Sequence, residues 1–200
     1  LALMHAARSY YSAGEGPQTA KKNEPAETVR QRQSYRDTAA KLFDLMVSQL
    51  PDTDETGDAL WWLAHRHLDR DDDPAEIDAA RAEFERLAKV CPKHERAPDA
   101  LFRASIILRE KGDAPSAFVL LRQIVERYPA NENVPAAAYD CGRLYLAQND
   151  RVHAAELFRK SVQSGGVGSF YAHRAQQRLA ELDDAGAGQA TAIRAPGIAG

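Results

Sequence analysis

The sequence is short of the features that mark the more specialised classes of protein. No run in its 200 residues approaches the roughly 18–20 consecutive apolar residues that a membrane-spanning helix needs. The formal net charge is −3, which is too small to indicate nucleic acid or an anionic membrane as the main partner. No strand followed by a glycine-rich phosphate loop is predicted. What is present is 44% apolar residues, enough for a packed interior.

One pattern occurs twice between residues 98 and 166. Similar residues coincide when the segment is shifted by 37 positions. Each copy consists of an amphipathic helix, a short polar break and a second amphipathic helix. The coinciding pairs include Ala100 with Ala137, Phe102 with Tyr139, Ala117 with Ala154, and Leu121 with Phe158. A period in the thirties is typical of helical-hairpin repeats, so the pattern predicts an all-α fold.

The residue types where the paired helices should cross resemble those of one repeat family. The second copy has Gly142 and Tyr145 on its first helix, and Ala154 and Phe158 on its second. The first copy ends on Pro129. A small–large pair, an alanine, an aromatic and a closing proline resemble the tetratricopeptide repeat (TPR). This resemblance implies a right-handed α-solenoid of about four helical hairpins with a C-terminal capping helix, in which the first helices line a concave groove.

The repeat register divides the chain into a helical domain and a tail. The predicted units cover residues 1–52 with a polar insertion at 15–31, then 57–95, 98–131 and 135–166, followed by a capping helix at 169–182. Residues 183–200 are rich in Gly and Ala without apolar periodicity, and we predict a flexible tail there. Because Leu1 falls within a helical pattern, we expect the chain to be a piece of a longer protein.

A group of polar residues in the second unit could suggest a metal site. His65 and His67 precede the acidic run 69–73. Residues two apart on a helix point in different directions, so the histidines cannot share a metal ion, and the aspartates lack calcium-loop spacing. We predict instead a solvated turn that caps the next helix, and the same capping role for Asp113 and Asp150. No catalytic residue, metal or cofactor is predicted.

Cysteine is scarce, and the two cysteines lie far apart in the repeat register. Cys91 is placed at the end of a second helix, and Cys141 at a core position of a later first helix. Stacked units contact only their neighbours, so these side chains should not meet. We predict two free, partly buried thiols, with a disulfide or a metal pair as the alternative.

The TPR resemblance also predicts which residues face the groove. Trp61, Phe102 and Tyr139 occupy equivalent positions in successive units. The full set predicted to bind a partner is Trp61, His65, Phe102, Ile106, Arg109, Tyr139, Arg143 and His173. Aromatic residues beside arginines are common in binding hot spots. The alternative is that these aromatics pack between adjacent first helices and are only half exposed.

The predicted function is a non-catalytic scaffold that binds a peptide or protein segment in the groove. The Ala-rich first helices and the Tyr128-Pro129 closure resemble extracytoplasmic bacterial TPR proteins of the outer-membrane assembly and Tol–Pal coordinator type. That resemblance implies a periplasmic or outer-membrane-associated protein, but no lipobox cysteine is visible, so lipid anchoring is not carried over. The alternative is the α-superhelical accessory region of a larger enzyme, such as a lytic transglycosylase, which residues Ser169–Ala172 resemble.

Overall fold

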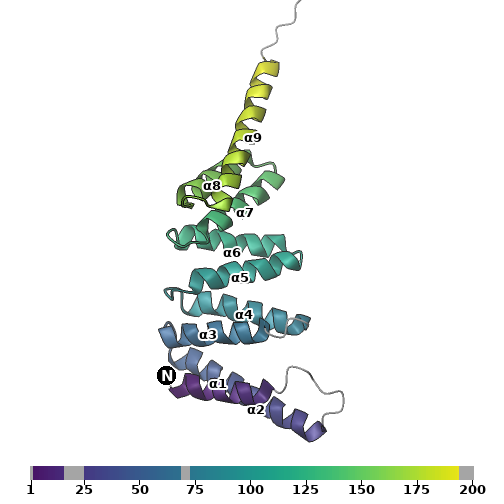
Figure 1. The fold of residues 1–200 in the computed structure, drawn as a ribbon, viewed down its shortest axis with the longest axis vertical. Coiled ribbons are helices and arrows are strands. Elements are labelled where there is room, and N and C mark those ends of the chain that lie inside the picture. Colours follow the sequence, from purple (N-terminus) through teal and green to yellow (C-terminus); the bar gives the residue numbers. More distant parts are fainter. Residues whose placement is uncertain (1, 16–24, 69–72, 194–200) are drawn as a thin grey trace, which may run out of the picture. The chain divides into compact units, whose positions relative to one another are not determined.

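The regular structure of the protein is α-helical. The computed structural model describes residues 2–15, 25–68 and 73–193. Within them there is no strand, which confirms that the fold is all-α, as predicted. The chain divides into two compact units, Leu1–Ala100 and Leu101–Gly200. The helices, shown in Figure 1, are α1 (Ala2–Glu15), α2 (Ala26–Gln49), α3 (Asp54–Leu68), α4 (Pro74–Val90), α5 (Ala97–Glu110), α6 (Ala114–Arg127), α7 (Val134–Ala147), α8 (Arg151–Ser164) and α9 (Phe170–Ile193).

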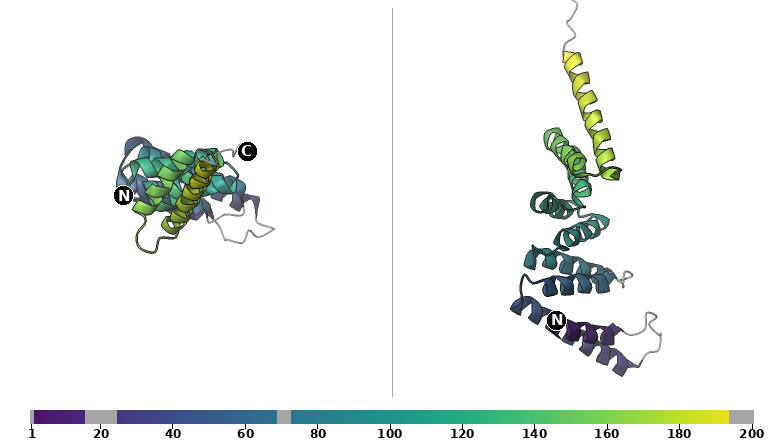
Figure 2. Two further views of the ribbon diagram at one scale, coloured as in Figure 1. Left: turned by 90° about the horizontal axis from the view of Figure 1, so that it is seen from above. Right: turned by 60° about the vertical axis from the view of Figure 1, so that its left-hand side comes forward.

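The first unit contains two helix pairs, α1 with α2 and α3 with α4 (Figures 1 and 2). Each second helix carries the predicted alanine and aromatic residue, and both residues are buried. These residues are Ala39 and Phe43 on α2, and Ala80 and Phe84 on α4. The Phe43 cluster continues onto the first helices through Ala7, Tyr11 and Leu63. Apolar positions at helical spacing therefore form the core that the sequence pattern predicts.

In the second unit α7 packs along α8, and α8 along α9. Gly142 of α7 lies where this helix crosses α8. A Cβ atom at Gly142 would lie 2.7 Å from the ring of Phe158 and 3.2 Å from the carbonyl oxygen of Ala154. Both residues are fully buried. The small residue predicted at the crossing is therefore required by close approach of the two helices.

The loops that join successive helix pairs repeat one hydrogen-bond pattern. Before each closing proline, a backbone N–H donates to the carbonyl oxygen four residues earlier, and these donors are Leu50, Cys91 and Tyr128. Three residues further on, a polar side chain accepts a backbone N–H near the start of the next helix, and these acceptors are Thr53, His94 and Asn131. His94 and Asn131 accept the N–H two residues ahead, whereas Thr53 accepts that of Thr56, three residues ahead. The last two of these loops therefore share one local geometry, and the first shares with them the hydrogen bond that ends the preceding helix.

The turns inside the last two helix pairs are also alike. Gly112 and Asn149 have φ angles of +81° and +61°, in the left-handed region that ends many helices. The N–H of the following residue bonds back to the helix in each case, Asp113 to Leu108 and Asp150 to Tyr145. The carboxylates of Asp113 and Asp150 then accept the N–H of Ser116 and His153 at 3.1 Å. Both predicted N-caps are confirmed.

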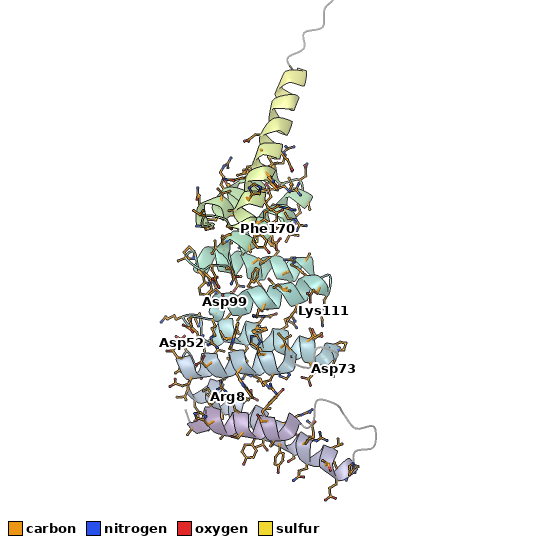
Figure 3. All side chains as sticks on the ribbon, in the orientation of Figure 1. Arg8, Asp52, Asp73, Asp99, Lys111 and Phe170 are labelled. Atoms are coloured by element: carbon orange, nitrogen blue, oxygen red, sulfur yellow. The ribbon has the colours of Figure 1, made fainter. Side chains whose placement is uncertain are left out.

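The prediction that the acidic segment 69–73 caps the next helix is also confirmed for Asp73. The side chain of Asp73, labelled in Figure 3, accepts the N–H of Ala75 at 2.9 Å and begins α4. The rest of the acidic run, residues 69–72, lies outside the described residues. Among the described residues, no group of three or more His, Cys, Asp or Glu side chains is placed to hold a metal ion.

Three boundaries differ from the prediction. Helix α2 begins directly after Pro25, so residues 26–31 of the predicted insertion are helical, and 16–24 lie outside the described residues. Helix α3 begins at Asp54, before the predicted start at Gly57, because the Thr53 hydroxyl caps the N–H of Thr56. Helix α9 continues beyond residue 182 to Ile193, since alanines there favour helix despite two glycines. No described helix is long and apolar enough to cross a membrane.

Candidate functional site

In the first unit, the predicted groove residues Trp61 and His65 lie together on α3. Their rings are 4.7 Å apart, and both contact the buried ring of Phe84 on α4, at 5.4 and 5.6 Å. The guanidinium of Arg96 lies 5.5 Å from the centre of the Trp61 ring. Both Trp61 and His65 are half-buried. They therefore pack within their own helix pair and keep part of their surface exposed.

In the second unit, Tyr139 makes the equivalent contact but is buried. Its ring lies 5.7 Å from Phe158 on α8 and 5.9 Å from Tyr171 on α9. Only 4% of Tyr139 is exposed, because α9 covers it. Tyr139 is therefore buried between α8 and α9, rather than half exposed between adjacent first helices. The prediction that its ring lines an open groove is wrong.

The other predicted residues of the second unit keep exposed surface. Phe102 and Ile106 lie one turn apart on α5 and are half-buried. Arg109 and Arg143 are 45% and 55% exposed at the side chain. His173 on α9 is exposed and bonds to Gln177 at 3.1 Å. Apolar and basic side chains are therefore available on α5, α7 and α9.

Asp140, which the sequence analysis did not select, links the two predicted arginines. Asp140 is 8% exposed, and its carboxylate accepts a hydrogen bond from the guanidinium of Arg109 on α5 at 2.5 Å. Arg143, one turn along α7, lies 3.5 Å from the other carboxylate oxygen. Burial raises the pKa of Asp140, although Arg109 and Arg143 act to lower it. A buried carboxylate thus holds two guanidinium groups at the surface.

Two further arginines converge on the hydroxyl of Tyr139. Burial acts to raise the pKa of Tyr139, but hydrogen bonds from Arg174 and Arg178 of α9 outweigh it and lower this pKa. Arg178 also bonds to Glu181 at 2.7 Å. We call Arg109, Arg143, Arg174 and Arg178 the arginine face, with Asp140 and Tyr139 as its buried anchors.

The spacing of Arg174 and Arg178 was a usable signal, since residues four apart share one helix face. The spacing could not identify the residue that these two arginines contact. Tyr139 lies on α7, and only packing of α9 over α7 brings the arginines to its hydroxyl. Asp140 had no signal at all, because a single carboxylate at an i, i+3 distance from an arginine is common on exposed helices.

Cys91 and Cys141 are free and buried, which confirms the predicted unpaired thiols. Burial raises the pKa of Cys141 to about 12. This thiol is therefore protonated at neutral pH, and the thiolate is the reactive form.

The pH dependence of stability should report the environment of Asp140. A folded pKa above the unfolded value of 3.8 gives stability that is fully present below that value and is lost as the pH rises through the folded pKa. The asparagine side chain of Asp140→Asn does not titrate, so the variant lacks this pH-dependent contribution to stability. The melting temperature of wild type minus that of Asp140→Asn should therefore increase as the pH falls from about 7 to about 4. Circular dichroism melts measure this difference, and a constant or decreasing difference would contradict the raised pKa.

Comparison with known proteins gave no assignment. No protein-family model matches this sequence, and no curated protein matches it. The TPR resemblance therefore rests on the repeat register and on the loop geometry of the chain itself.

Proposed function

We propose that this chain is a TPR-like, right-handed helical solenoid that acts as a non-catalytic scaffold for another protein. A segment of that protein binds across the first helices of the repeated pairs. The observation that carries the proposal is the repeated loop between helix pairs. In each loop the backbone N–H of Leu50, Cys91 or Tyr128 bonds to the carbonyl oxygen four residues earlier. Three residues further on, the side chain of Thr53, His94 or Asn131 accepts a backbone N–H near the start of the next first helix. Helix pairs joined by one repeated geometry favour a stack, and stacked repeats present extended surfaces for binding.

The first helices offer side chains suited to such a surface. Phe102 and Ile106 are half-buried on α5, and Arg109 lies one turn beyond. Half-buried aromatic residues with adjacent arginines supply area and directional hydrogen bonds together. The second helices expose mainly isolated apolar residues, of which Val119 on α6 and Val152 on α8 are 55% and 69% exposed. Val119 and Val152 therefore serve as control positions on the second helices.

Site-specific cross-linking tests which helices meet the partner. A photo-reactive amino acid is placed at Phe102, Ile106 or His173 on first helices, and at Val119 or Val152 on second helices. The protein is irradiated in an extract of the cells that make it. We expect cross-linked products from the first-helix positions. Products from Val119 and Val152 alone would place the binding surface on the second helices and overturn the proposal.

Phe102→Ala gives the strength of the interaction with the partner so identified. Removing a hot-spot aromatic should weaken binding by about 1–3 kcal/mol. The affinity is measured by calorimetry, with circular dichroism to verify that the variant is folded. Val119→Ala is the control, because it removes an exposed apolar side chain from a second helix. Equal affinities for wild type and folded Phe102→Ala would exclude this ring from the interface.

A further inference from the structure

We propose that the arginine face of the second unit binds an acidic segment of the partner polypeptide. This inference rests on the proposed scaffold function and assigns the chemistry of its ligand. Arg109 comes from α5, Arg143 from α7, and Arg174 and Arg178 from α9. In the repeat register α5 and α7 are first helices and α9 is the capping helix that follows, so one extended segment can cross them in sequence. The structure supplies three observations in support.

The guanidinium groups are held in place and still accessible. Asp140 accepts from Arg109 and lies 3.5 Å from Arg143, while Arg174 and Arg178 lie near enough to the Tyr139 hydroxyl to lower its pKa. The side chains of Arg109, Arg143 and Arg178 nevertheless remain 45%, 55% and 37% exposed. Each guanidinium has several N–H donors, and one carboxylate or hydroxyl partner leaves others for a ligand. Pre-positioned arginines lose less side-chain entropy when a carboxylate binds.

The charge of this face is opposite to that of the whole chain. Among the described residues, two carboxylates pair with these four guanidinium groups, those of Asp140 and Glu181, and Asp140 is buried. The whole chain has a formal net charge of −3. A local positive field on a negative protein attracts a short acidic segment and gives weak attraction to a long polyanion. An extended polypeptide segment with clustered Asp or Glu residues therefore fits better than nucleic acid or an anionic membrane.

Apolar side chains adjoin the arginines on two helices. Phe102 and Ile106 lie on α5 before Arg109, and both are half-buried. Phe170, at the start of α9 in Figure 3, is 63% exposed, and the guanidinium of Arg174 lies 5.6 Å from its ring centre. A polypeptide that combines carboxylates with apolar side chains can use both sets of contacts.

The test uses the full 200-residue chain and a synthetic labelled peptide of about 12 alternating Glu and Leu residues. Fluorescence anisotropy gives its affinity at about 50 mM and about 500 mM NaCl, because exposed ionic contacts weaken with salt. The same peptide with Gln in place of Glu is the uncharged reference. The double variant Arg143→Gln/Arg174→Gln leaves Arg109 on Asp140 and Arg178 on Tyr139, so both buried anchors keep a partner.

We expect the wild type to bind the Glu peptide more tightly than the Gln peptide, and less tightly at high salt. The double variant should lose about tenfold in affinity. The matched control is Arg122→Gln/Arg159→Gln, which removes the same charge from exposed sites on the second helices α6 and α8. The control should stay within about twofold of wild type, as expected for exposed surface charges.

Three results would overturn the inference. They are equal affinity for the Glu and Gln peptides, equal losses in the double variant and its control, and preferential binding of single-stranded DNA or phosphatidylserine vesicles by the same arginines. The scaffold proposal is judged separately through the cross-linked partner. If first-helix cross-links persist in the double variant while the Glu peptide shows no specific binding, the scaffold stands and the acidic ligand fails. If first-helix cross-links are absent from the wild type as well, the scaffold itself fails.

Discussion

Ala154→Glu is expected to unfold the α7–α8 pair and to cost about 3–5 kcal/mol. Ala154 is fully buried on α8, and its carbonyl oxygen lies beside Gly142, where the two helices approach closely. A glutamate there must either bury a carboxylate without a partner or separate the helices. The neighbouring Phe158 and Tyr139 would lose their packing in either case.

The loss is measured by urea unfolding with far-ultraviolet circular dichroism. Val152→Glu is the matched control, because it adds the same group two residues earlier on α8 at a site that is 69% exposed. The control should change stability by less than about 0.5 kcal/mol. Equal unfolding midpoints for Ala154→Glu and wild type would refute the helix crossing and the repeat register that predicted it.

Phe84→Ala should produce a comparable loss in the first unit, about 3–5 kcal/mol. Phe84 of α4 is fully buried, and its ring contacts both Trp61 and His65 of α3. Truncation leaves a cavity between α3 and α4, which close-packed helices fill only partly. The Trp61 ring should then become more exposed to water.

Tryptophan fluorescence measures this effect, and it is specific to one unit. Trp61 and Trp62 are the only two tryptophans, and both lie within Leu1–Ala100. Phe84→Ala should shift the emission to longer wavelength and lower the urea midpoint. Phe170→Ala removes the same side chain from a 63% exposed site in the second unit and should leave the fluorescence transition unchanged. Unchanged emission in Phe84→Ala would contradict the packing of Trp61 against α4.

Used together, these two variants report on the independence of the units. Ala154→Glu alters the second unit, where circular dichroism but not tryptophan fluorescence is sensitive. In repeat proteins, stability is approximately a sum of unit and nearest-neighbour contributions. If that description applies, Ala154→Glu should lower the circular dichroism midpoint more than the fluorescence midpoint. Phe84→Ala should lower the fluorescence midpoint at least as much as the circular dichroism midpoint.

The sequence by itself determined the helix order, the caps and the residues at the α7–α8 crossing. Asp113 and Asp150 cap helices because a carboxylate accepts an N–H two or three residues ahead, an interaction contained within one short segment. Gly142 was recognisable because its register relative to Ala154 and Phe158 repeats the pattern of the preceding unit. Such features depend on residues close in sequence or on a repeated spacing, and a single amino-acid sequence is enough to recognise either.

Only the tertiary structure decided the character of the candidate site. Periodicity predicted that Tyr139 lies on the groove side of α7, but it could not indicate that α9 packs against this residue and buries the ring. For the same reason the sequence could not show that Arg174 and Arg178 of α9 approach the Tyr139 hydroxyl. Their meeting with Tyr139, and that of Arg109 with Asp140, joins residues more than thirty positions apart. Helical spacing specifies which face a residue occupies, whereas its exposure and charge partners depend on the helix packed against that face.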